Sequence, residues 1–184
     1  VILSKFPMEA GGDIPFGKTL NSTLWVDVRV GGRTVRVYNV HLQSNRVTND
    51  AEKVMEDAEL EKGETWHEIG NVLGKVGSAT KRRVEQAQRL RNHMLECPHP
   101  VVVAGDFNDT PNSYVYRLLS EGMNDTFRDK ALGFGTTFAG VLPFLRIDYV
   151  LTDARFTTHR CQTLRSGFSD HHPVRVECGI GNAE

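Results

Sequence analysis

The sequence has no long hydrophobic run and no signal-peptide pattern at its start. No stretch approaches the roughly 20 consecutive apolar residues that a membrane-spanning helix needs. We therefore expect these 184 residues to be soluble. They carry no indication of where in the cell the protein acts.

Cysteine and net charge are also scarce. Cys97, Cys161 and Cys178 are odd in number and far from any CxxC or Cys/His zinc spacing, so buried or idle thiols are expected. The formal net charge of −1 argues against a strongly nucleic-acid-binding surface. Charge is uneven, however, because residues 52–64 are acidic and residues 81–91 are basic.

The length and the 39% hydrophobic content suffice for one well-buried core, so a single domain over residues 1–184 is expected. Residues 1–4 are apolar and predict a strand with no polar lead-in, as in a chain cut within a folded unit. We therefore expect a fragment of a larger domain. Residues 8 to about 18 are rich in Gly and Pro and predict a loop.

The stretch 101–113, VVVAGDFNDTPNS, changes abruptly from apolar to polar residues. Its β-branched start predicts a short strand buried on both faces and ended by Gly105. Asp106 and Asn108 follow two apart, so in an extended chain their side chains point the same way. Pro111 suits the first position of a helix. The pattern predicts a ligand site at the end of a central strand, although a plain Asp/Asn turn explains it equally well.

A β-hairpin is predicted before this stretch. Apolar and polar residues alternate over 24–30, as in a half-buried strand, and Gly31-Gly32 is a two-residue hairpin signal. The returning strand 34–42 should pair antiparallel with the first. On it Asn39 and His41 continue the face of two valines, so the apolar row turns polar toward the strand's end, as at the rim of a site.

Helices are expected between this hairpin and the central strand. Residues 44–80 are long and charged and are interpreted as an insertion of one or two helices. Their apolar stripe consists of Trp66, Ile69, Leu73 and Val76. His67-Glu68 lacks the second His of a zinc-binding helix, and residues 70–75 lack the spacing of a phosphate-binding loop.

A further helix is predicted over residues 80–95. Its apolar side is formed by Val84, Ala87, Leu90 and Met94. Its basic residues are expected on a solvated face rather than in a nucleic-acid patch.

The last third of the chain predicts short strands that carry polar residues. Residues 146–151 alternate around Asp148, which needs a partner because an unpaired buried carboxylate is costly. A glycine and aromatic loop, residues 133–138, could line a substrate pocket or simply pack. Residues 169–173, SDHHP, precede a strand over 174–178. The whole pattern predicts an α/β fold with two packed sheets rather than one wound sheet.

Polar side chains gather at the ends of four predicted strands. They are Asn39, His41, Asp106, Asn108, Asp148, Asp170 and His171. Together they supply oxygen ligands suited to Mg²⁺ or Mn²⁺, two imidazoles and amide donors. Such a set suits metal-assisted attack of water on a phosphoester, which needs stabilised phosphoryl charge, an oriented water and an acid for the leaving oxygen.

Five motifs carry a resemblance to a known family. They are Ser4-Lys5-Phe6-Pro7, Asn39-Val40-His41-Leu42, Gly105-Asp106-Phe107-Asn108, Arg146-Ile147-Asp148-Tyr149 and Ser169-Asp170-His171-His172-Pro173. In this order they resemble the endonuclease/exonuclease/phosphatase superfamily, which includes pancreatic-type deoxyribonuclease, abasic-site endonucleases, neutral sphingomyelinases and inositol-polyphosphate 5-phosphatases. The resemblance implies a four-layer α/β/β/α sandwich of the deoxyribonuclease I type, here incomplete at the N-terminus.

The resemblance also implies catalytic roles. Asp106 would orient or deprotonate the attacking water, and Asn108 would hold the phosphate and Asp106. His171 would lie against the scissile phosphate, as base or as electrostatic stabiliser, with Asp148 as the partner that fixes its tautomer and favours its protonated form. His41 would donate to a phosphate oxygen or to the leaving group.

The implied ligands for Mg²⁺ or Mn²⁺ are Asp106, Asn108 and Asp170. Family members also carry an Asn and a Glu, the principal metal ligand, upstream of the motif at residues 4–7, and this sequence starts at that motif. We therefore expect an incomplete metal site and an exposed sheet edge, which invites pairing. Either a missing N-terminal segment of the same polypeptide completes the fold or the chain associates; no obligate protein partner is inferred.

Structural roles stay open for several residues. His41 could be a satisfied core histidine, Asp148 a structural hydrogen-bond acceptor, and Asn39 could serve the backbone of its own strand end. His172 is expected to be exposed rather than catalytic.

The sequence therefore predicts a divalent-metal-dependent phosphoesterase that acts by in-line attack of water. Its substrate would be a phosphodiester, from nucleic acid or a phospholipid head group, or a phosphomonoester. The rival is a catalytically silent phosphate-binding or interaction module, which the absent Glu favours and the intact site residues oppose.

Overall fold

The computed structural model describes residues 1–17, 19, 21–44, 64–139 and 144–181, with residues 64–76 described by their backbone alone. The elements in chain order are β1 (Met8–Ile14), β2 (Ser22–Val30), β3 (Arg33–His41), α2 (Glu64–Leu95), β4 (Val101–Asp106), α3 (Tyr114–Ser120), β5 (Met123–Asp125), α4 (Thr126–Lys130), β6 (Asp148–Asp153), β7 (Phe156–Thr163) and β8 (Val174–Ile180). Among these residues, no helix is long and apolar enough to cross a membrane.

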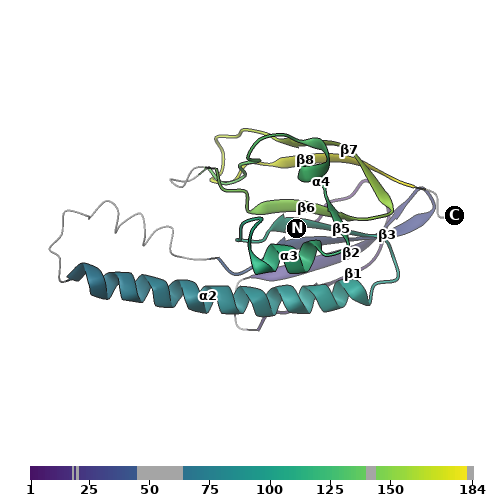
Figure 1. Ribbon diagram of the computed structural model, residues 1–184. Helices are drawn as coiled ribbons and strands as arrows, with labels where there is room; N and C mark the ends of the chain where they lie inside the picture. The colour runs from purple at the N-terminus through teal and green to yellow at the C-terminus, as the bar shows by residue number, and fades with distance from the viewer. Residues whose placement is uncertain (18, 20, 45–63, 140–143, 182–184) are drawn as a thin grey trace.

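The strands form two sheets, as the alternating patterns predict. A six-stranded sheet has the order β1-β2-β3-β4-β6-β5, and β7 pairs with β8 in a second, two-stranded sheet. Strands β3 and β4 are parallel, whereas the other neighbouring strands are antiparallel. Figure 1 shows α2 and α3 below the large sheet and the β7-β8 pair with α4 above it. The fold is therefore mixed α/β, as expected.

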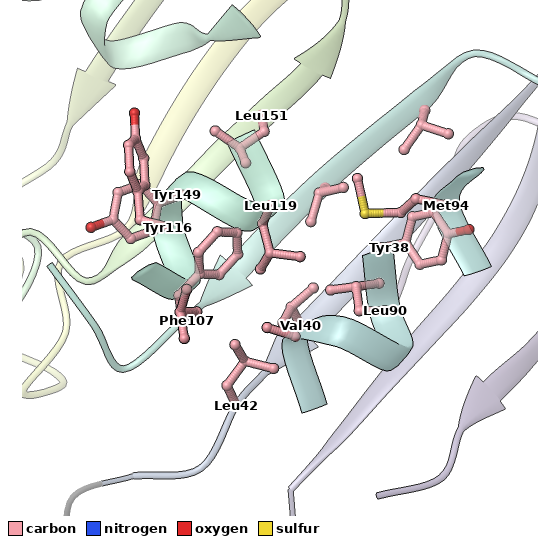
Figure 2. Packing of buried hydrophobic residues seen from close by; sticks show 14 of the residues in the cluster. Tyr38, Val40, Leu42, Leu90, Met94, Phe107, Tyr116, Leu119, Tyr149 and Leu151 are labelled. Atoms are coloured by element: carbon pink, nitrogen blue, oxygen red, sulfur yellow. The ribbon is translucent and has the colours of Figure 1, made fainter. Parts of the chain in front are cut away.

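The hydrophobic core lies between the large sheet and helices α2 and α3 (Figure 2). Alternate residues of three strands face these helices, because successive side chains of a strand point to opposite faces. Members from the strands and the segments that follow them include Tyr38, Val40, Leu42, Val101, Val103, Tyr149 and Leu151. From the helices they include Ala87, Leu90, Met94, Val115 and Leu119. The opposite face turns polar at one end of these strands, where it carries His41, Asp106 and Asp148.

The predicted hairpin is confirmed, but the prediction for the chain before it is wrong. Residues 1–4 form no strand, and β1 occupies most of the segment predicted as a Gly/Pro-rich loop. In β1, Gly12 lies opposite Trp25 of β2, and a Cβ at Gly12 would come within 3.0 Å of the Trp25 ring. The glycine therefore allows the indole to lie close to the strand, instead of marking a loop.

The helix predicted over 80–95 is the second half of a longer one. Helix α2 begins at Glu64, and its start within the expected insertion makes the predicted boundary at Thr80 wrong. Residues 45–63 and the side chains of the predicted Trp66–Val76 stripe lie outside the described residues. The basic residues are not uniformly solvated, because Arg83 is buried.

Strand β4 differs from its prediction in three details. Val101 and Val103 are buried under the helices, whereas Val102 and Ala104 on the other face are only half-buried, because that face leads to the polar row. Gly105 continues the strand and does not end it. Pro111 lies in a turn, and α3 starts only after Ser113, whose side chain caps it by accepting a hydrogen bond from the Tyr116 N–H.

Candidate active site

The site begins as a row of side chains across three strands. His41 lies opposite Asp106 in the parallel pairing of β3 and β4, and Asp106 lies opposite Asp148 in the antiparallel pairing of β4 and β6. Residues directly opposite one another share a face of a sheet. The three side chains therefore point from the face that is turned away from the core helices.

Gly105 brings β3 and β4 close together beside this row. Its φ is +137°, and a Cβ there would lie 2.1 Å from the carbonyl oxygen of Val40. Only glycine adopts this φ without strain and leaves room for the Val40 carbonyl oxygen. The glycine of the predicted motif thus sets the spacing between His41 and Asp106, whose Nε2 and Oδ2 atoms are 3.9 Å apart.

Asn108 is folded back onto Asp106. Its φ is +51°, so the chain is no longer extended and the condition under which both side chains would point the same way is not met. The Asn108 N–H donates to Asp106 Oδ1 at 2.7 Å, and its Nδ2 donates to Asp106 Oδ2 at 2.8 Å and to the Leu42 carbonyl at 3.0 Å. Asn108 therefore holds the carboxylate of Asp106, as the resemblance implies.

His171 reaches the row from the segment between β7 and β8. Its Nδ1 lies 2.8 Å from Asp148 Oδ2, which gives the half-buried Asp148 the partner that a shielded carboxylate requires. The ring of Phe138 packs edge-on against His171, with centroids 5.3 Å apart. Thr137 Oγ1 accepts the backbone N–H groups of Ile147 and Asp148, both at 3.0 Å. The His171–Asp148 pair is therefore held in place from both sides.

The side chain of His41 is 58% exposed, which excludes the alternative of a satisfied core histidine. Asp106 in the middle of the row and Asp148 at its other end are half-buried. The row therefore presents one accessible imidazole beside two shielded carboxylates.

The pKa values of Asp106, His171 and His41 are shifted because these groups lie close together and are partly buried. Burial and the charge of Asp148 raise the pKa of Asp106 to about 6, against the Asn108 N–H and the charges of His171 and Arg83, which lower it. Burial lowers the pKa of His171, but the hydrogen bond to Asp148 and the charges of Asp148, Asp106 and Asp170 outweigh it, so the net pKa is raised. Partial desolvation and the charge of His171 lower the pKa of His41.

The structure brings together His41, Asp106, Asn108, Asp148 and His171, but it leaves three other candidates aside. Asp170 is exposed, and its Oδ1 accepts a hydrogen bond from Ser169 Oγ at 3.2 Å. Asn39 donates from Nδ2 to the Val1 carbonyl at 3.1 Å, so it serves the backbone. His172, expected to be exposed, is half-buried, because its backbone N–H donates to Thr137 and its Nδ1 accepts from Ser166.

Three groups could hold a divalent ion, within the part of the chain that the structure describes. They are Asp106, Asp148 and His171, whose ligand atoms lie within 4.8 Å of one another. Two carboxylates this close repel one another, and a cation relieves that repulsion. Carboxylate oxygens also suit Mg²⁺ and Mn²⁺. The donor set therefore fits a divalent metal.

Two supports of the site, the buried Arg83 and the half-buried Asp109, were not predicted. Arg83 Nε donates to Asp109 Oδ2 at 3.1 Å, and Arg83 Nη1 donates to the Gln43 carbonyl at 2.8 Å. The sequence held a signal for Arg83, because it lies four and seven residues before Ala87 and Leu90, on the apolar side of the helix. Asp109 offered no signal beyond its place in the polar turn.

A cavity of about 860 Å³ adjoins the site. Aromatic side chains line much of it, together with Arg165 and His172. Phe134 and Phe144 pack with ring centroids 4.9 Å apart and are both exposed. Since Phe138 both lines this cavity and packs against His171, the cavity and the row share a wall.

Comparisons with solved structures support the fold. A mannosyl-6-phosphatase from Bacteroides thetaiotaomicron matches with a TM-score of 0.64 and 20% identity, covering 96% of this chain and 68% of that one. The human Nocturnin catalytic domain with bound sulfate matches with a TM-score of 0.60 and 15% identity, covering 95% and 60%. D. rerio TDP2 complexed with a single-strand DNA product matches with a TM-score of 0.61 and 15% identity, covering 94% and 68%.

The match to a family model shows to which protein family the chain belongs. No curated protein matches the sequence. The model of the Endonuclease/Exonuclease/phosphatase family, however, matches residues 1–171, which include all five predicted motifs except the last two residues of SDHHP. That family unites nucleases and phosphatases, which are hydrolases of phosphate esters, and the match confirms the resemblance. The chain therefore belongs to the endonuclease/exonuclease/phosphatase family.

Proposed function

We propose that this chain carries the catalytic residues of a divalent-metal-dependent phosphoesterase that cleaves its substrate by in-line attack of water. One observation carries the proposal. His41, Asp106 and Asp148 form a row across three strands, and His171 is hydrogen-bonded to the end of that row. The row places a shielded carboxylate, a paired imidazole and an exposed imidazole beside one another.

Asp106 takes the proton of the attacking water. A pKa of about 6 keeps its carboxylate mostly ionised at neutral pH yet basic enough to accept a proton. Asn108 fixes that carboxylate through both of its oxygens. The water oxygen then forms a bond to phosphorus while the bond from phosphorus to the leaving oxygen breaks.

His171 stabilises the phosphoryl charge. Its partner Asp148 raises the pKa of His171, so the imidazolium form, which attracts phosphoryl oxygens, is favoured. His41 is exposed and donates to a phosphate oxygen or to the leaving oxygen. The two histidines thus act at opposite sides of Asp106 in the row.

The proposed ligands of Mg²⁺ or Mn²⁺ are Asp106 and Asn108, together with Asp170, which the resemblance implies. Asp170 is exposed and outside the row, but it precedes His171 directly in the sequence and its charge raises the pKa of His171. His171 and Asp148 are each other's hydrogen-bond partners at 2.8 Å, so the pair is assigned to charge stabilisation instead. The Nδ2 group of Asn108 is committed to Asp106 and Leu42, which leaves its Oδ1 as the ligand atom. A bound divalent cation would neutralise the phosphate and the crowded carboxylates.

The cavity beside the row supports a substrate with an apolar or aromatic group. Its aromatic lining suits a nucleobase or an apolar chain, and Arg165 and His172 suit a neighbouring phosphate. We therefore propose a phosphodiester substrate, from nucleic acid or a phospholipid head group, ahead of a small phosphomonoester.

Hydrolysis of bis-(p-nitrophenyl) phosphate with Mg²⁺, with Mn²⁺ or with EDTA tests the function. The 184-residue chain and any longer native polypeptide that contains it are assayed side by side. We expect turnover that EDTA abolishes and that Asp106→Asn or His171→Ala lowers by about 100-fold or more. Asp153→Asn, which changes a carboxylate paired with Arg155 outside the row, is the control and should keep full turnover.

Near-normal turnover in folded Asp106→Asn or His171→Ala protein would overturn the proposed roles. If no polypeptide hydrolyses this substrate or natural diesters and monoesters, the silent phosphate-binding module is the better description. Equilibrium binding of inorganic phosphate to the wild type and to His171→Ala would then test that module directly.

A further inference from the structure

Arg83 is a buried cation that joins a helix to the segments following two active-site strands. It is 2% exposed and lies on α2. Its Nε donates to Asp109 Oδ2 at 3.1 Å, and its Nη1 donates to the Gln43 carbonyl at 2.8 Å. A planar guanidinium presents these donors in a fixed fork, so it sets the separation of the two acceptors.

Both acceptors lie within two residues of the proposed machinery. Gln43 follows His41 at the end of β3, and Asp109 directly follows Asn108. The same two segments are also joined by the Asn108 side chain, which donates to the Leu42 carbonyl at 3.0 Å. The guanidinium of Arg83 therefore joins the same two segments from the side of α2.

Asp109 extends this connection to the third strand of the row. Its carbonyl oxygen accepts a hydrogen bond from the Tyr149 hydroxyl at 2.8 Å, and Tyr149 directly follows Asp148. Gln86, one turn along α2 from Arg83, accepts the Gln43 N–H at 2.7 Å. The segments after β3 and β4 are thus fixed to the helix and to β6 by buried groups.

We propose that Arg83 and Asp109 are positioning residues of the active site. The ion pair holds the 106–109 turn against the end of β3, so that Asn108 stays in its left-handed conformation with both Asp106 oxygens hydrogen-bonded. Neither residue touches the reacting atoms. This inference rests on the proposed function for its kinetic consequence, but not for its structural one.

Two variants and one matched control test the proposal in the full chain. Arg83→Gln removes the charge and the fork, and Asp109→Asn removes the charge of the partner at nearly equal size. Arg82→Gln makes the same change one residue earlier, at an exposed position. Arg83→Lys keeps the charge without the fork.

We expect Arg83→Gln to lower kcat by about 10- to 100-fold with KM nearly unchanged, because a small displacement of catalytic groups acts on the chemical step. The double variant with Asp109→Asn should be no slower than the slower single variant, since both changes break one connection. Arg83→Lys should recover part of the loss, and Arg82→Gln should match the wild type.

Amide hydrogen exchange at Asn108, measured by NMR, gives a readout that does not depend on activity. The Asn108 N–H should be protected in the wild type and in Arg82→Gln, and should lose protection in Arg83→Gln and Asp109→Asn while the β4 amides keep theirs. Unchanged protection and unchanged kcat in folded Arg83→Gln protein would overturn the proposal. If neither the 184-residue chain nor a longer polypeptide that contains it is active, the proposed function fails, and the exchange measurement still decides the positioning role.

Discussion

At the scale of single residues, the site depends on places where only one side chain fits. Gly105 is the clearest case. Its φ of +137° strains any other residue, and an added Cβ would lie only 2.1 Å from the Val40 carbonyl oxygen. Any side chain there must separate β3 from β4. His41 and Asp106, which face each other one residue farther along these strands, would separate with them.

Gly105→Ala should therefore lower both stability and activity. We expect the free energy of unfolding to fall by about 3 kcal/mol or more, since backbone strain and a clash with backbone atoms add together. Urea denaturation measures this. Gly122→Ala is the control, because Gly122 also has a positive φ of +70° but a Cβ at this position would meet no atom within 4 Å.

That control should lose only about 1 kcal/mol, the usual cost of a left-handed residue other than glycine. Equal losses at the two glycines would show that conformation alone, and not the approach of β3, makes Gly105 necessary.

At the scale of helices and strands, the sequence predicted most of the elements, but it predicted the pairing only of the hairpin strands β2 and β3. The alternation around Val26, Val37 and Asp148 was strong enough to identify β2, β3 and β6. Their order in the sheet depends on contacts between distant segments, which no local pattern records. Strand β1 was missed because its glycines, which make room for Trp25, also resemble a loop.

The candidate site was predicted through its motifs and not through its geometry. His41, Asp106, Asn108, Asp148 and His171 were all selected, and the structure gathers all five. What the sequence could not supply is the row itself, since a shift of one residue in any pairing would turn a side chain to the core face. The buried Arg83 was missed because it lies within a run of basic residues that are typical of a solvated helix face.

The apolar face of α2 should carry most of that helix's contribution to stability. Leu90 is fully buried in the core, whereas Leu95 at the end of the same helix is 67% exposed. We expect Leu90→Ala to lower the free energy of unfolding by about 3 kcal/mol through lost burial and the cavity left behind. Leu95→Ala should change it by less than about 0.5 kcal/mol. Urea denaturation of both variants checks the contrast, and similar losses would contradict the assignment of the two faces.

At the scale of the whole molecule, the buried ion pair of Asp125 and Arg146 connects the side of the large sheet with that of the second sheet. Asp125 and Arg146 are almost fully buried and form two hydrogen bonds, at 3.0 and 2.8 Å. Asp125 also caps α4 and accepts the Tyr116 hydroxyl of α3 at 2.6 Å. Since α4 packs against β7, this carboxylate connects α3 and the large sheet with the second sheet.

The stability of the whole fold should therefore depend on pH through Asp125. Burial raises the pKa of Asp125, but the hydrogen bonds from Arg146 and Tyr116 outweigh it, so the net pKa lies below the ordinary aspartate value. A carboxyl group whose pKa is lower in the folded state stabilises that state above its unfolded pKa, about 4. This contribution should be complete at neutral pH and lost as the pH falls through the lower, folded pKa.

Asp125→Asn removes the charge at nearly constant size and leaves the buried Arg146 without its counter-ion. At neutral pH we expect the free energy of unfolding to fall by about 3–5 kcal/mol, as when one partner of a buried ion pair is lost. Asp153→Asn, whose partner Arg155 is half exposed, should cost less than about 1 kcal/mol. Because the wild type loses the contribution of Asp125 in acid and the variant has none to lose, their difference should narrow as urea denaturation is repeated from neutral pH down to about pH 3. A difference that stays constant over this range would mean that Asp125 acts through its shape and hydrogen bonds, and that its charge does not hold the layers together.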